Sequence, residues 1–432
     1  MNWNSRYRVK SYLRSSLWIV PVFAGLAERV FRIIVEWLEG RLSWVGFGLG
    51  LEGAKALSSA VITLTLSFLV FTFGSLLVAI QVASGQYTPR IIATTLLRDN
   101  VIRYTVGLFV FTFLFCIRSL NHLETTVPQL AMFVVGALGL ICLAAFMFLI
   151  DYAARLLRPV SLVKRVGNDG LAVIKSVYPE KLVGAPGRAI PLQDAGPVER
   201  TILHRGTSGV ILAVNVPQLV AKAEKANGVI EFAPQVGDFV GADEPLFLLH
   251  GGAKAVDEKS LRDCVIFGSE RTLEQDPLFA FRILVDIAIK ALSAAINDPT
   301  TAVLAIDQLH RLLRSAGRRN LRTNSIRDSS GTLRVIFRTP DWCTFVHLAF
   351  VEIRFYGASN IQIARRLRAM IINLGNTLPS ERHAALRREE GLLDRMLEKL
   401  YVLPEDLALA RIPDSQVLGG STEATMPKCA AK

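Results

Sequence analysis

The sequence contains few cysteines and histidines, and it arranges neither in a pattern that binds metal or supports redox chemistry. Five of the 432 residues are cysteine and six are histidine. No cysteine pair has CxxC spacing. No HExxH motif, phosphate-binding glycine loop or nucleophile–base arrangement is present either. We therefore expect no metal site and no cofactor, and the sequence gives only weak support for an enzyme.

Charged residues are missing from residues 56–83, a run of twenty-eight positions. A helix needs about 20 mostly apolar residues to cross a bilayer, and a shorter buried helix would not have to exclude every charge. Two further apolar runs, 101–120 and 127–150, follow. The sequence therefore predicts an α-helical integral membrane domain over residues 1–158.

An earlier apolar segment at about 15–37 leaves three alternatives open. It could be a cleaved signal peptide, although its uncharged part is short. It could be a span that ends near Ala27 and continues along the membrane surface as an amphipathic helix. It could also be a full span, because Glu28, Arg32 and Glu36 are spaced four apart and can form ion pairs along one helical face. The full span gives about four transmembrane helices.

Basic residues cluster before the first span, between the second and third, and after the fourth. With four spans these segments share one side of the membrane, so the positive-inside rule places both termini in the cytoplasm. The net charge of +12 fits this arrangement, and it indicates anionic lipids as partners together with the bilayer itself. Binding to nucleic acid is not expected.

Small polar side chains recur along the second span in one row. Hydroxyls at this spacing allow close helix packing, or they can line a pore or substrate path. Beyond the row, a segment with Gly85 and Pro89 should bend at the membrane surface, as a gate or as a turn at the headgroups. The candidate intramembrane polar residues are Glu28, Arg32, Ser59, Thr63, Ser67, Ser75 and Gln81, and those of the gate or headgroup turn are Gln86, Tyr87, Pro89 and Arg90.

The remainder of the chain has ordinary globular composition and is expected to form a cytoplasmic α+β domain. A linker at 159–199 should precede a small β-rich module at 200–252, whose closing turn is similar to a biotinyl/lipoyl-type hammerhead. No lysine occupies the hairpin tip that such a carrier modifies. A mainly helical part at 253–403 and a tail at 404–432, disordered at its end, complete the chain.

Two Asp-Pro pairs, each followed by an apolar-periodic run, predict two N-capped helices in tandem within the helical part. The first of these helices also carries a row of polar side chains at four-residue spacing. This row is either an ion-paired surface or a polar binding site. The candidate cytoplasmic polar site comprises Asp276, Arg282, Asp286, Lys290, Asn297 and Asp298. The basic segment 311–334 is expected to be a solvated loop that contacts anionic lipid.

Three segments, SGQYTPR, GDFV and QDPLFAFRILVDIAIKALSAAINDPTTA, carry a resemblance to a known family. The chain resembles the bacterial membrane proteins of the domain of unknown function 2254 family from its basic N-terminus to about Leu403. The resemblance implies a multi-pass protein of the bacterial inner (plasma) membrane with a cytoplasmic region. It supplies no activity and no catalytic residues.

Two functions are compatible with these patterns. The first is a homo-oligomeric ion channel or transport-type protein with a cytoplasmic sensing or gating domain. It depends on the charged first span, the hydroxyl row and the bent segment after it. The alternative is a membrane-anchored scaffold or regulator that binds a partner or ligand through its cytoplasmic domain and is not an enzyme.

Overall fold

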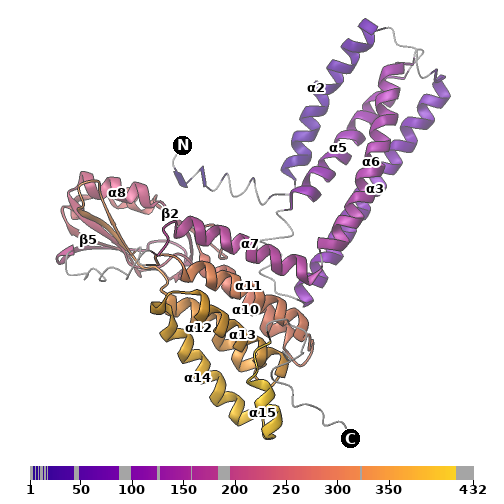
Figure 1. The fold of residues 1–432 in the computed structure, drawn as a ribbon. Helices are drawn as coiled ribbons and strands as arrows, with labels where there is room; N and C mark the ends of the chain where they lie inside the picture. The colour runs from indigo at the N-terminus through magenta and orange to yellow at the C-terminus, as the bar shows by residue number, and fades with distance from the viewer. Residues whose placement is uncertain are drawn as a thin grey trace, which may run out of the picture. The chain divides into compact units, whose positions relative to one another are not determined.

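The computed structural model describes residues 18–42, 48–86, 99–123, 127–156, 158–182, 195–321 and 324–414, with seven single residues before position 17. The chain divides into two compact units, one formed by residues 9–85 and 89–161 and the other by residues 1–8, 86–88 and 162–432. Figure 1 labels the elements of both units.

The first unit is a group of long helices: α2 (Ile19–Leu42), α3 (Leu51–Gln86), α5 (Asn100–Asn121) and α6 (Gln129–Leu156). Within the described residues, three segments are long and apolar enough to cross a membrane, namely Leu51–Val82, α5 and α6. Helix α2 is not among them, because charged side chains interrupt its apolar sequence. The expected count of four spans is therefore not confirmed, whereas three are found.

Glycines allow the helices of this membrane unit to approach each other closely. A Cβ atom on Gly139 of α6 would lie 2.9 Å from Val61 Cγ2 of α3, and one on Gly107 of α5 would lie 2.8 Å from Val20 Cγ1 of α2. Both positions leave room only for hydrogen, as in other membrane helix pairs. Helices α3 and α6 also meet through Phe68 and Phe146, whose stacked rings lie 4.0 Å apart.

Carboxylates cap two of the membrane helices. Asp99 accepts a hydrogen bond from the Val101 amide (2.9 Å) at the start of α5. It also accepts one from the Tyr152 hydroxyl of α6 (2.6 Å). At the start of α6, the Glu39 side chain accepts from the amides of Leu130 (3.0 Å) and Ala131 (3.1 Å). Helix N-termini favour negative charge, so these contacts fix how the helices begin.

The second unit, which we call the soluble unit, contains two sheets. Strands β1-β5-β3-β8-β7 form one in that order, and β4-β2-β6 form the other. The strands are β1 (Val198–Leu203), β2 (Gly209–Val214), β3 (Gly228–Phe232), β4 (Phe239–Val240), β5 (Pro245–Gly251), β6 (Val265–Gly268), β7 (Ser325–Arg327) and β8 (Leu333–Phe337).

The sheets are not confined to the segment 200–252. Strand β8 pairs in parallel with β3, and β6 pairs with β2. Segment 253–403, expected to be mainly helical, therefore supplies three strands. A parallel partner can return to the sheet only after a crossover, and here the crossover contains helices α10 and α11.

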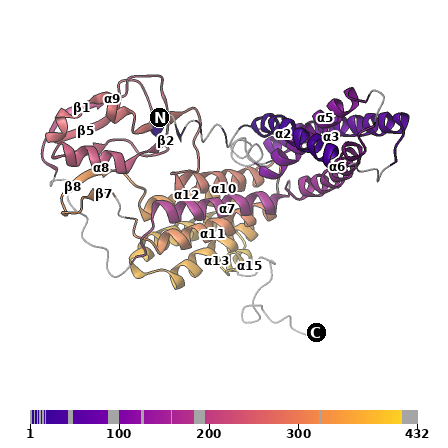
Figure 2. The same cartoon turned by 90° about the horizontal axis from the view of Figure 1, so that it is seen from above.

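A layer of helices lies beside the strands in Figure 2. Helix α10 packs against α11 and α12. It is apolar on nearly every face, which suits a helix covered from several sides. The helices of this unit are α7 (Pro159–Val177), α8 (Val216–Lys225), α9 (Glu258–Arg262), α10 (Pro277–Ala291), α11 (Pro299–Gly317), α12 (Trp342–Gly357), α13 (Ile361–Thr377), α14 (His383–Leu400) and α15 (Pro404–Ala410), with 3₁₀ turns η3 (Gly252–Ala255) and η4 (Ser380–Arg382).

Two expected irregular segments are regular instead. Residues 159–177 of the expected linker form α7, whose Gly170 packs so closely that a Cβ atom there would lie 2.7 Å from Ala280 Cβ. The expectation of a solvated loop at 311–334 is wrong for much of its length. Helix α11 continues to Gly317 because its buried leucines face the core, and β7 and β8 pair as an antiparallel hairpin. Residues 322–323 of that segment lie outside the described residues.

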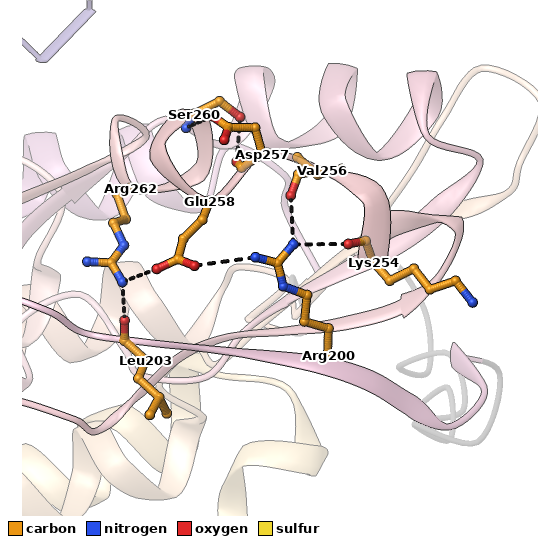
Figure 3. Close-up of polar contacts among 8 residues, drawn as sticks. All are labelled: Arg200, Leu203, Lys254, Val256, Asp257, Glu258, Ser260 and Arg262. Carbon is orange, nitrogen blue, oxygen red and sulfur yellow. Dashed lines mark hydrogen bonds and ion pairs between the residues drawn. The ribbon is translucent and has the colours of Figure 1, made fainter.

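Figure 3 shows how the outer strand β1 is anchored. The Glu258 carboxylate on α9 binds both Arg200 of β1 (3.3 Å) and Arg262. Arg200 also donates to the Lys254 carbonyl (3.1 Å), and Arg262 donates to the Leu203 carbonyl (2.7 Å). These bonds tie segment 254–262 to β1, which is the outermost strand of its sheet among the described residues.

Candidate functional site

The charged residues of α2 are placed in two different environments. Glu28 is fully buried, and its Oε2 atom lies 2.9 Å from Arg118 Nη1 of α5. Arg32 instead pairs with Glu36 of its own helix, with 2.7 Å between Arg32 Nε and Glu36 Oε1. The four-residue spacing therefore joins Arg32 to Glu36, while Glu28 reaches a residue that is distant in sequence.

The hydroxyl row of α3 lies on the outer side of the membrane unit. Ser59, Thr63, Ser67 and Ser75 are all exposed. Thr63, Ser67 and Ser75 donate to carbonyls one turn earlier, at 2.8 to 3.0 Å, which satisfies hydroxyls in an apolar surrounding. The polar side chains that α3 turns inward are different ones: Ser58, Thr65 and Thr72.

The polar candidates at the end of α3 can be placed only in part. Gln81 is exposed on the last turns of the helix. Helix α3 continues through Gly85 and ends at Gln86. The side chain of Gln86 and the whole of Tyr87, Pro89 and Arg90 lie outside the described residues.

The structure separates the six cytoplasmic candidates. Asp276 and Asp298 cap α10 and α11, accepting from the amides of Phe279 and Thr301 at 3.1 Å each. The two aspartates therefore stand at opposite ends of a 15-residue helix, about 22 Å long at 1.5 Å per residue. Asn297, which has a φ of 47°, forms the turn between the helices. The predicted N-caps are confirmed, but these groups do not form one site.

The charged row of α10 is joined to another helix. Arg282 Nη2 donates to Glu352 Oε2 of α12 (2.8 Å), and Arg282 Nε donates to Asp286 (2.7 Å). These bonds raise the pKa of Arg282 and lower that of Glu352. Lys290 lies half-buried two turns further along α10 from Arg282. The row thus connects α10 to α12 within the fold.

A cleft between the sheets and the helices unites residues that the sequence patterns did not connect. Its volume is about 600 Å³, which is within the range of small-molecule sites. One wall consists of sheet residues, including Phe232, Val335 and Phe337. The opposite wall comes from the segment that ends α7 and from the start of α10, including Tyr178 and Asp276.

Two buried polar groups stand at this wall. The Tyr178 side chain is fully buried, and its hydroxyl has no hydrogen-bond partner within the described part of the chain. Burial raises the pKa of Tyr178, and the charge of Asp276 raises it further. Burial also raises the pKa of Asp276, against the opposing effect of Arg271, whose Nε lies 2.7 Å from Asp276 Oδ2. A buried hydroxyl without a partner loses about 1–3 kcal/mol relative to a bonded one.

Other polar groups surround the opening of the cleft. Gln275 accepts a hydrogen bond from the Val214 amide (2.9 Å), which holds its side chain in place. Arg338 is exposed and, among the described residues, has neither a hydrogen bond nor an ion pair. The cleft therefore combines an apolar wall with an amide and an available cation, which together suit an amphipathic organic anion.

Comparison with known proteins agrees with the membrane helices. The model of a family described as predicted membrane proteins, the domain of unknown function 2254 family, matches residues 14–373. The chain belongs to this family. The resemblance seen in its sequence motifs is thereby confirmed.

Three relatives are similar to this protein along nearly the whole chain. Uncharacterized proteins of Mycobacterium bovis and of two strains of Mycobacterium tuberculosis are each 25% identical over 443 residues. The alignments cover 98% of this chain and 82% of each relative. No solved structure matches the chain. The family match establishes a membrane protein.

Sequence reasoning missed Tyr178 and Arg338, which lie far apart in the chain and in no motif. Only the parallel pairing of β8 with β3 brings segment 325–340 next to the end of α7. Within the described residues, no three histidine, cysteine, aspartate or glutamate side chains are grouped closely enough to hold a metal ion.

Proposed function

We propose that this protein is a membrane-anchored regulator whose soluble unit binds a small amphipathic anion in the cleft. The supporting observation is that the end of α7 forms part of the cleft wall. Residues 176–180, at the end of α7, contribute to it, and α7 begins at Pro159, only three positions after membrane helix α6 ends at Leu156. A ligand bound between the sheet and this segment would favour one position of α7. Because α7 follows α6 directly in the chain, ligand binding could change the conformation of the membrane helix α6.

The ligand would use each kind of group in the cleft. Its apolar body would lie on Phe232, Val335 and Phe337, and its anionic group would pair with Arg338. A polar atom could accept from the Tyr178 hydroxyl, which lacks a partner within the described chain. Binding would then satisfy a buried donor as well as cover apolar surface.

The test uses 8-anilinonaphthalene-1-sulfonate, a naphthalene that carries a phenylamino group and one sulfonate, and the full-length protein in lipid nanodiscs. Ser325→Trp fills the cleft from β7, and Ser329→Trp places the same ring on an exposed turn that does not line it. We expect wild type and Ser329→Trp to show probe fluorescence above the lipid background, and Ser325→Trp to show only that background. Hydrogen exchange of α7 should slow on binding in those two proteins only.

The probe also binds lipid, but all three proteins share that background. Equal fluorescence in the two tryptophan variants would refute binding in the cleft. Fluorescence lost only in Ser325→Trp, with unchanged exchange in α7, would refute the regulatory part of the proposal.

The α3 hydroxyl row favours a second candidate, a homo-oligomeric channel or transport protein. The row is exposed on the described chain, so another copy could pack against it or water could reach it in an oligomer. In this version both termini are cytoplasmic and the membrane is the bacterial inner membrane. Ser67→Leu should reduce ion flux into liposomes, whereas Leu66→Ile, an exposed change off the row, should not. Ion-tight liposomes containing wild-type oligomer would contradict this candidate.

A further inference from the structure

A groove beside the C-terminal turns of α11 carries a concentration of positive charge. Its volume is about 440 Å³, and the residues that line it are Leu171, Lys181, Arg311, Arg314, Ser315, Arg318 and Arg319. Five of these seven are cationic, and none is acidic or aromatic. The groove is distinct from the proposed ligand cleft, since the two share no lining residue.

The backbone that carries these cations is held in place. Lys181 and Arg319 form an antiparallel bridge, and the Leu182 amide donates to the Arg318 carbonyl (2.9 Å). The Arg319 guanidinium donates to the Pro179 carbonyl (3.1 Å). The Arg319 carbonyl in turn accepts from Arg382 (2.9 Å). The groove is thus built on a strand-like pairing at the end of a helix, which holds the backbone that carries its cations.

Three cations of the groove, Arg311, Arg318 and Arg319, donate hydrogen bonds to neutral groups. Arg311 donates to Asn168 (3.2 Å) and also to the Gln308 amide oxygen. Arg318 donates to the Thr377 carbonyl (3.3 Å). For Arg314 and the Lys181 side chain, no hydrogen bond or ion pair exists within the described chain. The nearest carboxylate in sequence, on Glu180, accepts instead from Asn320 (3.2 Å).

Several arginines elsewhere in the soluble unit form ion pairs with acidic side chains. Arg334 pairs with Asp328 at 2.8 Å, and Arg366 and Arg368 each pair with an aspartate. Several like charges within one Debye length repel one another and raise the free energy of the empty site. The five cations around the groove lack the acidic partners that Arg334, Arg366 and Arg368 have, so an anion bound there would relieve their mutual repulsion.

We infer that this groove binds a phosphate group with at least two negative charges. Guanidinium forks match phosphate oxygens in pairs, and a multiply charged phosphate can engage several cations at once. The volume admits a phosphate with a small attached group. Single-stranded nucleic acid binds along aromatic stacking surfaces, which the groove lacks. The phosphate could belong to a soluble metabolite or to the headgroup of an anionic lipid, since both present the same chemistry.

The test compares two double variants of the full-length protein. Arg314→Gln with Arg318→Gln removes two groove charges. Arg387→Gln with Arg388→Gln removes two charges that are also exposed, from α14, and neither residue lines the groove. Titration calorimetry in detergent with inorganic pyrophosphate measures soluble phosphate binding. Native mass spectrometry measures retained phosphatidylglycerol against phosphatidylcholine.

We expect the groove variant to lose binding by about tenfold or more, and the α14 variant to stay close to wild type. Pyrophosphate binding that depends on the groove identifies a soluble phosphate as the ligand, and phosphatidylglycerol retention that depends on it identifies a lipid. Equal losses in both variants, or no binding of either probe to wild type, would overturn the inference. Unchanged thermal midpoints show that the variants are folded, and Ser325→Trp should bind both probes like wild type.

Discussion

At the residue scale, Arg282 has one partner close in sequence and another on a distant helix. Its spacing from Asp286 along the helix was visible in the sequence, and the structure contains that bond. Its stronger partner is Glu352, whose two carboxylate oxygens both accept from the guanidinium. Such a bidentate pair joins α10 to α12, and no local sequence pattern predicts it.

The Glu352 pair leads to a prediction about pH. Hydrogen bonding from Arg282 lowers the pKa of Glu352 in the folded protein. The ionised Glu352 side chain therefore contributes its full stabilisation above about pH 4.3, the pKa of a glutamate in an unfolded chain. This stabilisation is lost as the pH falls through the lower pKa of Glu352 in the folded protein. Because Glu352 is 41% exposed, Glu352→Gln should lower the free energy of unfolding at pH 7 by only about 0.5–1 kcal/mol. The difference should narrow below about pH 4.

Thermal unfolding of the two proteins in detergent at several pH values measures this difference. Glu381→Gln, at an exposed glutamate of η4, serves as the control and should follow wild type throughout. A difference for Glu352→Gln that stays constant from neutral to acid pH would show that the charge of Glu352 is not what stabilises the pair.

At the element scale, α7 is the helix whose packing depends most visibly on glycine. A Cβ atom on Gly170 would meet Ala280 Cβ at 2.7 Å and Leu312 Cδ2 at 3.1 Å, and neither neighbour can move without disturbing the core. A Cβ atom on Gly167 would meet Gln308 Oε1 at 2.4 Å, the far end of a flexible side chain. The two glycines therefore limit the approach of α7 to different degrees.

These contacts predict that replacing glycine by alanine has a large effect on stability at one position and a small effect at the other. Gly170→Ala should destabilise the soluble unit by about 1–3 kcal/mol, because overpacking exceeds the gain in helix propensity. Gly167→Ala should change stability by less than about 1 kcal/mol, since Gln308 can rotate away and alanine favours the helix. Thermal midpoints of the two variants provide the comparison. Equal destabilisation would mean that α7 does not pack as closely on α10 as described.

At the scale of the whole molecule, membrane orientation connects the helices to the soluble unit. Three helices between Gly50 and residue 158 are long and apolar enough to cross a membrane, and three crossings would put Gly50 and residue 158 on opposite sides. From the distribution of basic residues, the positive-inside rule predicts that the soluble unit lies in the cytoplasm. Whether α2 crosses decides the side of the N-terminus, and the burial of Glu28 against Arg118 favours a crossing, because the pair lowers the energy of charge inside a bundle.

Labelling of cysteines with a membrane-impermeant maleimide tests this orientation. Cys343 is exposed, whereas Cys116, Cys142 and Cys264 are buried, so Cys343 reports on the soluble unit once Cys429 is replaced by serine. We expect Cys343 and an added Asn2→Cys to react only in inverted vesicles. Gly50→Cys, at a position with open space around it, should react in intact spheroplasts. Labelling of Asn2→Cys from outside would show that α2 does not cross.

The sequence by itself determined the features that depend on local periodicity and on neighbouring residues. The apolar runs gave three membrane helices, the Asp-Pro pairs gave the starts of α10 and α11, and short β-branched segments gave β2, β3 and β5 almost to the residue. Each of these follows from burial patterns or capping within a few positions along the chain.

Only the tertiary structure decided which distant residues meet. It placed β8 beside β3, Glu28 beside Arg118, and Tyr178 beside the start of α10. It also gathered Lys181 with the arginines of α11 around one groove. These contacts join segments separated by tens of residues, and their formation depends on the whole packing rather than on any local pattern. The membrane helices could therefore be predicted from the sequence, whereas the candidate binding sites required the fold.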